Sequence, residues 1–163
     1  MNEVITGLIQ DGIFAALAAL GFAAISNPPR RAYIWCAVIA AAGHSLRFSL
    51  MQWAHFHIVA ASFCAALLIG LLAVLLAPRI KVPAETELYP ALLPMIPGIY
   101  AYKTFAAIVM CMHYSGEQDF QHYFYLFASN GLTTFFILMA MVLGATIPMF
   151  AFQRLSFQAT RQL

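Results

Sequence analysis

Five apolar stretches, separated by short polar segments, dominate the pattern along this chain. They cover residues 4–25, 31–51, 58–77, 88–113 and 123–149. A helix rises ~1.5 Å per residue, so about 20 apolar residues cross the hydrocarbon core of a bilayer. The pattern therefore predicts an all-α integral membrane protein with about five transmembrane helices. The last stretch exceeds the required length and should tilt, kink near Pro148 or begin in the interface.

The fourth apolar stretch is interrupted by Pro90, Pro94, Pro97 and Gly98. Irregular backbone at membrane depth is tolerated only where protein or a water-filled cavity surrounds it. We expect this helix to be broken at Pro94-Pro97-Gly98 and to restart near Gly98. Residues 98–113 would span only ~24 Å as a helix, so the new N-terminus should open inside the membrane and attract an anion. The alternative is a proline kink in a packed helix.

Composition supports a membrane protein and excludes several other classes. Hydrophobic residues make up 63% of the chain and charged residues 9%, whereas soluble domains carry about 25% charged residues. With 163 residues, the chain has no room for a separate soluble domain, so we expect a single transmembrane domain over residues 1–163. A scattered net charge of +2 predicts no nucleic-acid partner.

Basic residues outside the apolar stretches fall only in alternate loops. The first loop holds Arg30 and Arg31, the third holds Arg79 and Lys81, and the C-terminal tail holds Arg154 and Arg161. Because Lys and Arg are enriched in cytoplasmic loops, this pattern predicts an external N-terminus and a cytoplasmic C-terminus. Pairs of small residues four positions apart also recur, and such pairs permit close helix approach. They are Gly12 and Ala16, Ala37 and Ala41, Ala66 and Gly70, and Ala140 and Gly144.

Away from their ends, the apolar stretches contain the ionisable residues Asp11, His44, Arg47 and Lys103, and the amide Asn130 lies at a similar depth. At ~1.5 Å per residue they all lie roughly 9–15 Å below the outer ends of their helices, so we expect one polar layer. Ionisable groups in a bilayer are costly and usually functional. Two cations against one acid suit a substrate that carries a carboxylate, while His44 and Asp11 are candidates for proton coupling. The alternative is a structural pair between Asp11 and Arg47.

Other chemistry finds little support in the sequence. Histidines and acids gather in the second and fourth loops: His55, His57, His113, Glu117, Asp119 and His122. They lack a recognised ligand spacing, so we expect no metal site. No phosphate-binding loop or pair of nucleophile and base is present, so we expect neither a cofactor nor an enzyme.

Several strings of residues resemble one known family. They are Gly21-Phe22-Ala23, Asn27-Pro28-Pro29-Arg30, Trp35-Cys36-Ala37, Gly43-His44-Ser45-Leu46-Arg47 and Pro94-Met95-Ile96-Pro97-Gly98-Ile99-Tyr100-Ala101-Tyr102. In order and spacing they are similar to the YjjB-type small subunit of the threonine/serine exporter (ThrE-like) superfamily. The resemblance covers most of the chain, although the third and fifth helices contribute no matching string.

This resemblance implies a secondary transporter of two polypeptides in the bacterial cytoplasmic membrane, with a YjjP-type large subunit as partner in a hetero-oligomer or multimer. It implies proton-driven export of threonine and serine, with succinate and related C4 dicarboxylates as the alternative substrates. A non-transporting assembly subunit is the other alternative. By match to the motifs, His44, Arg47, Pro97, Gly98 and Tyr102 are candidate substrate-binding residues. Lys103, Asn130 and Asp11 are candidates from their depth alone.

Overall fold

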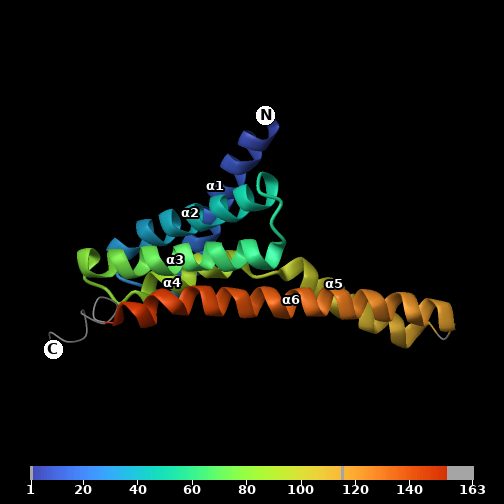
Figure 1. Cartoon of the computed structure of the whole chain (residues 1–163). Coiled ribbons are helices and arrows are strands. Elements are labelled where there is room, and N and C mark those ends of the chain that lie inside the picture. The colour runs from blue at the N-terminus through green and yellow to red at the C-terminus, as the bar shows by residue number, and fades with distance from the viewer. Residues whose placement is uncertain (1, 115, 154–163) are drawn as a thin grey trace. The chain divides into compact units, whose positions relative to one another are not determined.

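The structure, a computed structural model, describes residues 2–114 and 116–153 (Figure 1). All regular structure in these ranges is helical. The elements are α1 (Asn2–Ser26), η1 (Arg30–Ala32), α2 (Tyr33–Gln52), α3 (Ile58–Ile80), α4 (Glu85–Leu92), η2 (Leu93–Met95), α5 (Gly98–His113) and α6 (Glu117–Ala151). Arg154 and Arg161, on which the predicted orientation partly depends, lie outside the described residues.

The predicted fold class is confirmed. Among the described helices, α1, α2 with η1, α3 and α6 are each long and apolar enough to cross a membrane. A fifth span results if α4 with η2 and α5 are counted as one bent pair. The exposed surface is rich in large apolar side chains, for example Phe14, Leu17 and Phe105. Such a surface suits contact with lipid rather than water.

The predicted break in the fourth span is present. The η2 turn ends at Met95 and α5 begins at Gly98, after a tight turn in which the Gly98 amide donates to the Ile96 carbonyl at 2.8 Å. Pro97, with φ −77° and ψ 62°, is the N-cap and supplies no side-chain hydrogen bond to the helix start. The first amides of α5 therefore begin without a side-chain cap, as expected for a helix that restarts at a proline and a glycine.

The last helix starts at Glu117, six residues before the apolar stretch at residue 123. Glu117 and Asp119 lie in its first turn, where negative charge is favourable near the positive end of the helix dipole. The fourth loop is correspondingly short, and His122 lies on a helix instead of in a loop. Hydropathy alone could not show this extension, because the added turns are polar.

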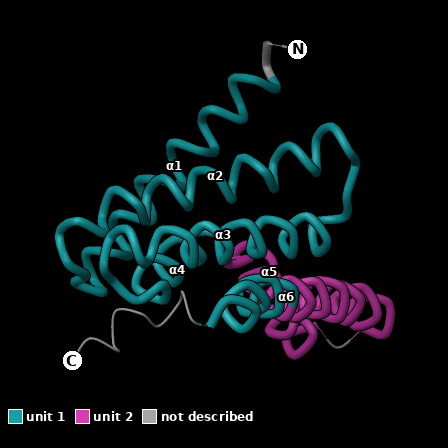
Figure 2. Tube along the Cα trace, turned by 60° about the vertical axis from the view of Figure 1, so that its left-hand side comes forward, with its two compact units in different colours: residues 1–95, 140–163 teal, residues 96–139 magenta. Residues whose placement is uncertain are grey.

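The chain divides into two compact units, which we describe separately (Figure 2). Unit 1 comprises Met1–Met95 and Ala140–Leu163, and unit 2 comprises Ile96–Met139. In unit 1, α1 packs on α2 and α2 on α3, while α4 contacts all three of these helices. The buried core of this unit consists largely of alanine, including Ala19, Ala40 and Ala65. The single transmembrane domain expected from the sequence stays a prediction.

Small residues bring the helices of unit 1 into close contact, as their spacing predicted. A Cβ atom built on Gly70 of α3 would lie 2.6 Å from the carbonyl oxygen of Ala145 on α6. A Cβ atom on Gly144 would lie 2.6 Å from the carbonyl oxygen of Phe63 on α3. On α1, a Cβ atom on Gly12 would lie 3.0 Å from the Ser45 hydroxyl of α2. The two backbones at the α3–α6 crossing are therefore nearly in contact, which only glycine permits.

Candidate functional site

Two of the predicted polar side chains meet between α1 and α2 in unit 1. His44 Nδ1 and Asp11 Oδ2 are 3.3 Å apart, and the side chains are 7% and 33% exposed. The Nε2 atom of His44 is buried and has no hydrogen-bond partner among the described residues. An imidazole paired with a carboxylate in a membrane helix is a typical proton-carrying arrangement, and one nitrogen remains available.

Arg47 does not form the direct pair with Asp11 that was considered as the structural alternative. Its Nη1 donates to the carbonyl oxygen of Met95 at 3.4 Å. Met95 is the last residue of η2, so the guanidinium lies at the negative end of the short helix that precedes the break. Arginine has five N–H donors, and this bond uses one of them.

A second polar group lies in unit 2, where Lys103 and Asn130 line the same cavity of about 580 Å³. Tyr123 and Ser129 add hydroxyl groups to the lining, and Ala106 and Met110 are among its apolar members. The Asn130 Nδ2 donates to the Leu126 carbonyl at 2.7 Å, which leaves the amide oxygen available as an acceptor. A cation and a neutral acceptor in a mainly apolar hollow can hold a small zwitterion.

The remaining predicted site residues lie at the start of α5 in unit 2. A Cβ atom on Gly98 would meet nothing within 4 Å, so there is space beside this residue. Pro97 is buried, and Tyr102 is 73% exposed and does not line the cavity beside Lys103. Tyr102 therefore lies on an exposed face, and an anion site at the start of α5 stays a prediction.

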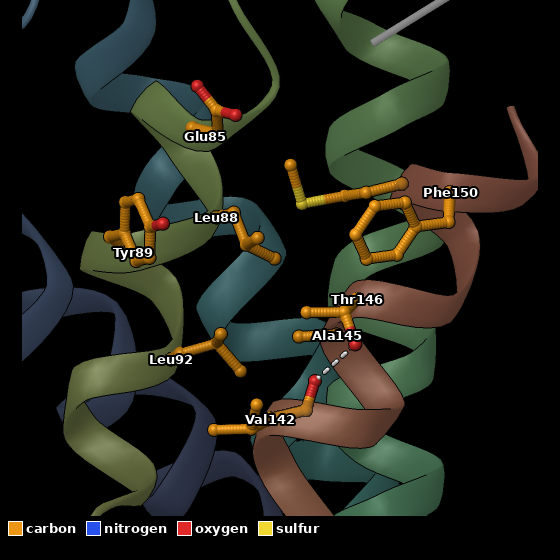
Figure 3. A pocket seen from close by; sticks show the side chains of 9 residues that line it. Glu85, Leu88, Tyr89, Leu92, Val142, Ala145, Thr146 and Phe150 are labelled. Atoms are coloured by element: carbon orange, nitrogen blue, oxygen red, sulfur yellow. Dashed lines mark hydrogen bonds between the residues drawn. The ribbon is translucent and has the colours of Figure 1, made fainter. Parts of the chain in front are cut away.

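A cavity of about 450 Å³ in unit 1 has a different character (Figure 3). Leu88 and Leu92 of α4 point toward Val142 and Phe150 of α6, with Glu85 at one end. The Thr146 hydroxyl donates to the Val142 carbonyl of its own helix at 2.8 Å, as the dashed line in Figure 3 shows. This cavity is therefore mainly apolar and offers little to a charged substrate.

Sequence reasoning missed one ionisable residue, Glu87 in the first turn of α4. Its side chain is 0% exposed, and neither carboxyl oxygen has a hydrogen-bond partner among the described residues. Glu87 lies one position before the apolar stretch 88–113 and therefore outside the predicted span. The one feature of the sequence that could have drawn attention to Glu87 is its position just before the proline-interrupted segment that begins at Pro90.

Within residues 2–114 and 116–153, no group of three His, Cys, Asp or Glu side chains lies close enough together to hold a metal ion. These residues instead form a helical membrane protein with ionisable groups inside its spans and one interrupted span. That combination defines the class of multi-pass membrane proteins with polar groups inside the bilayer, to which many transporters belong.

The family follows from a comparison with known proteins. The sequence profile described as "Threonine/Serine exporter, ThrE" matches residues 11–151. The chain therefore belongs to the threonine/serine exporter family, which confirms the resemblance found in its motifs.

One curated relative is an uncharacterized protein of Haemophilus influenzae. It is 38% identical over 147 residues, which are 90% of this chain and 48% of the relative. The chain thus spans about half the length of this relative. No solved structure was found to match the chain.

Proposed function

We propose that this protein is the small subunit of a two-component secondary transporter that exports threonine and serine in exchange for protons. The observation that carries the proposal is the match to the threonine/serine exporter family over residues 11–151. The relative of about twice the aligned length supports a second component, for which a YjjP-type large subunit is the candidate. The location is the bacterial cytoplasmic membrane, with the N-terminus outside and the C-terminus in the cytoplasm.

The cavity beside Lys103 and Asn130 supplies the chemistry that a hydroxy amino acid needs. The Lys103 ammonium attracts the carboxylate, and the free amide oxygen of Asn130 accepts from the ammonium or hydroxyl group of the substrate. Ala106 and Met110 can pack against the methyl group of threonine. The open start of α5 at Gly98 provides a further anion-attracting feature in the same unit.

The charge of this cavity favours an amino acid over a C4 dicarboxylate. Among its described lining residues, Lys103 is the one cation, and the other polar members are neutral. A zwitterion needs one cation and one acceptor, whereas a dianion needs two cations or leaves one carboxylate unpaired in an apolar environment. One cation with neutral acceptors therefore suits threonine and serine.

The test is efflux of radiolabelled threonine from vesicles that contain this chain and its partner, with serine and succinate as competitors. Lys103→Gln should weaken threonine affinity about tenfold or more, because a charge-assisted bond of ~1.5–3 kcal/mol is lost and ~1.4 kcal/mol is a factor of ten. The matched control is Arg79→Gln, which removes an exposed basic residue near the end of α3. That variant should transport normally.

Three outcomes would overturn the proposal or part of it. Stronger competition by succinate than by serine would support a dicarboxylate exporter. Normal threonine affinity in Lys103→Gln would remove the cavity from the binding site. If the wild-type complex transports no threonine and Lys103→Gln no longer copurifies with the partner, an assembly subunit would be supported instead.

A further inference from the structure

Glu87 combines complete burial with a lack of partners, and nothing in the transport site described above uses it. Its side chain is 0% exposed, and both carboxyl oxygens are without a hydrogen-bond partner among the described residues. The described structure contains one ion pair, between His44 and Asp11, so no Lys, Arg or His neutralises Glu87 there. A carboxyl group in this environment is out of contact with both water and counter-charge.

The helices around Glu87 carry several other titratable groups, none of which hydrogen-bonds to it. On α2, the Cys36 Sγ donates to the carbonyl oxygen of Thr86, the residue before Glu87, at 3.8 Å. The other groups on the helices packed against α4 are Asp11 on α1, Tyr33, His44 and Arg47 on α2, and Cys64 and Arg79 on α3. Asp11 and His44 pair with each other, and Arg47 bonds to Met95.

The two faces of α4 separate Glu87 from the apolar cavity. Glu85 and Leu88 are three positions apart and line the cavity in Figure 3, whereas Glu87, Pro90 and Ala91 are buried at the i, i+3 and i+4 spacing of another face. The helix α4 packs on α2, and the Cys36 Sγ of α2 donates to the Thr86 carbonyl next to Glu87. Glu87 is therefore held inside the helix bundle and away from the cavity.

An isolated carboxylate in such a place is strongly disfavoured, and the group keeps its proton instead. It can ionise only in another conformation, in which water reaches it. The segment that carries Glu87 is short, because α4 and η2 lie between Pro83 and the break at Pro97. A small movement of this segment would expose the carboxyl group without unfolding a long helix. Proton release would then favour the exposed conformation, and proton uptake the buried one.

We propose that Glu87 is a proton-binding site whose carboxyl group is protonated in the conformation described here and releases its proton when α4 moves and water enters. Glu87 binds the proton on one side of the membrane and releases it on the other, in exchange for the exported amino acid. This inference rests on the proposed exporter function and assigns its proton-carrying residue. Cys36, whose Sγ donates to the Thr86 carbonyl next to Glu87, lies 11 positions before Arg47 on α2, or ~16 Å at helical rise.

Infrared spectroscopy tests the protonation state without any transport assay. The chain contains four glutamates, Glu3, Glu85, Glu87 and Glu117, so labelling the glutamate side chains of this chain alone with ¹³C, with an unlabelled partner, shifts only their carboxyl bands. The wild-type complex in lipid should show one shifted band of a protonated carboxylic acid at neutral pH, and Glu87→Gln should lack it. Glu85→Gln, which removes a partly exposed acid two residues away, should keep it. A wild-type spectrum without this band overturns the proposal.

Transport by the reconstituted complex tests the coupling. Glu87→Gln mimics the protonated group, so exchange of external for internal threonine should remain within about twofold of wild type. Net efflux driven by an imposed pH gradient should fall at least tenfold, while Glu85→Gln keeps both activities. Gradient-driven efflux at the wild-type rate in Glu87→Gln would overturn the proposal. If the wild-type complex transports neither threonine nor serine, the proposed exporter function is wrong. The infrared band then still tests whether Glu87 is protonated.

Discussion

Alanine at position 70 should destabilise the packing of α3 on α6 in unit 1. A Cβ atom there would lie 2.6 Å from the Ala145 carbonyl oxygen and 3.2 Å from the Ala145 Cα atom. Both neighbours are backbone atoms, which cannot move aside by a change of rotamer. The two helices must therefore separate by a few tenths of an ångström or more, and contacts along the crossing weaken together.

The magnitude follows from two opposing contributions. Overpacking a tight contact costs about 1–3 kcal/mol, whereas replacing glycine by alanine inside a helix contributes about 1 kcal/mol of stability. Gly70→Ala should thus lower the free energy of unfolding by about 0–2 kcal/mol. Gly21 in α1 is the matched control, because a Cβ atom there would meet nothing within 4 Å. Gly21→Ala should show only the stabilising contribution of about 1 kcal/mol.

Thermal unfolding in detergent micelles, followed by fluorescence or by loss of the monomer peak in gel filtration, provides the measurement. The informative quantity is the difference between the two variants, which should be about 1–3 kcal/mol because the helix-propensity gain cancels. Gly144→Ala should behave like Gly70→Ala, since its Cβ atom would lie 2.6 Å from the Phe63 carbonyl oxygen. If all three variants were equally stable, the close α3–α6 crossing would be wrong.

Three further predictions concern polar groups in unit 1. Ser62→Ala should leave the free energy of unfolding unchanged or raise it by about 1 kcal/mol, because the buried Ser62 hydroxyl has no partner among the described residues. A lower melting temperature than wild type would contradict this prediction. A double-mutant cycle of Asp11→Asn and His44→Gln should give a coupling energy of about 0.6–1.7 kcal/mol, and additive effects would show that the 3.3 Å pair contributes nothing. Arg47→Gln should reduce threonine efflux while the complex still copurifies with its partner, because the bond to the Met95 carbonyl at the break is lost; normal efflux would refute a role for this contact.

Much of the fold was predictable because hydropathy is a local property of the sequence. The apolar stretches located the spans, and Pro94, Pro97 and Gly98 located the break, since proline and glycine limit the backbone wherever they occur. The start of α6 was missed by six residues, because a polar turn that extends an apolar helix has no hydropathy signal. The spacing of Ala66 and Gly70 indicated a close crossing, and the structure identified α6 as the neighbour.

The candidate site was less predictable, because depth along a helix does not give the direction in which a side chain points. The sequence placed Asp11, His44 and Arg47 at similar depths and suggested a pair between Asp11 and Arg47. In the structure Asp11 pairs with His44, and Arg47 donates a hydrogen bond to the Met95 carbonyl. Lys103 and Asn130 do share a cavity. Whether these groups and the helix start at Gly98 bind substrate stays a prediction.

The sequence by itself determined that this protein is helical, lies in a membrane, has one interrupted span and belongs to an exporter family. These properties depend on composition, on local backbone chemistry and on motifs, all of which are written in consecutive residues. Only the tertiary structure decided which polar groups meet and which are isolated. The burial of Glu87 is the clearest case, because α4 is short and polar at its start, and the helices packed around it, not its own sequence, exclude water from that carboxyl group.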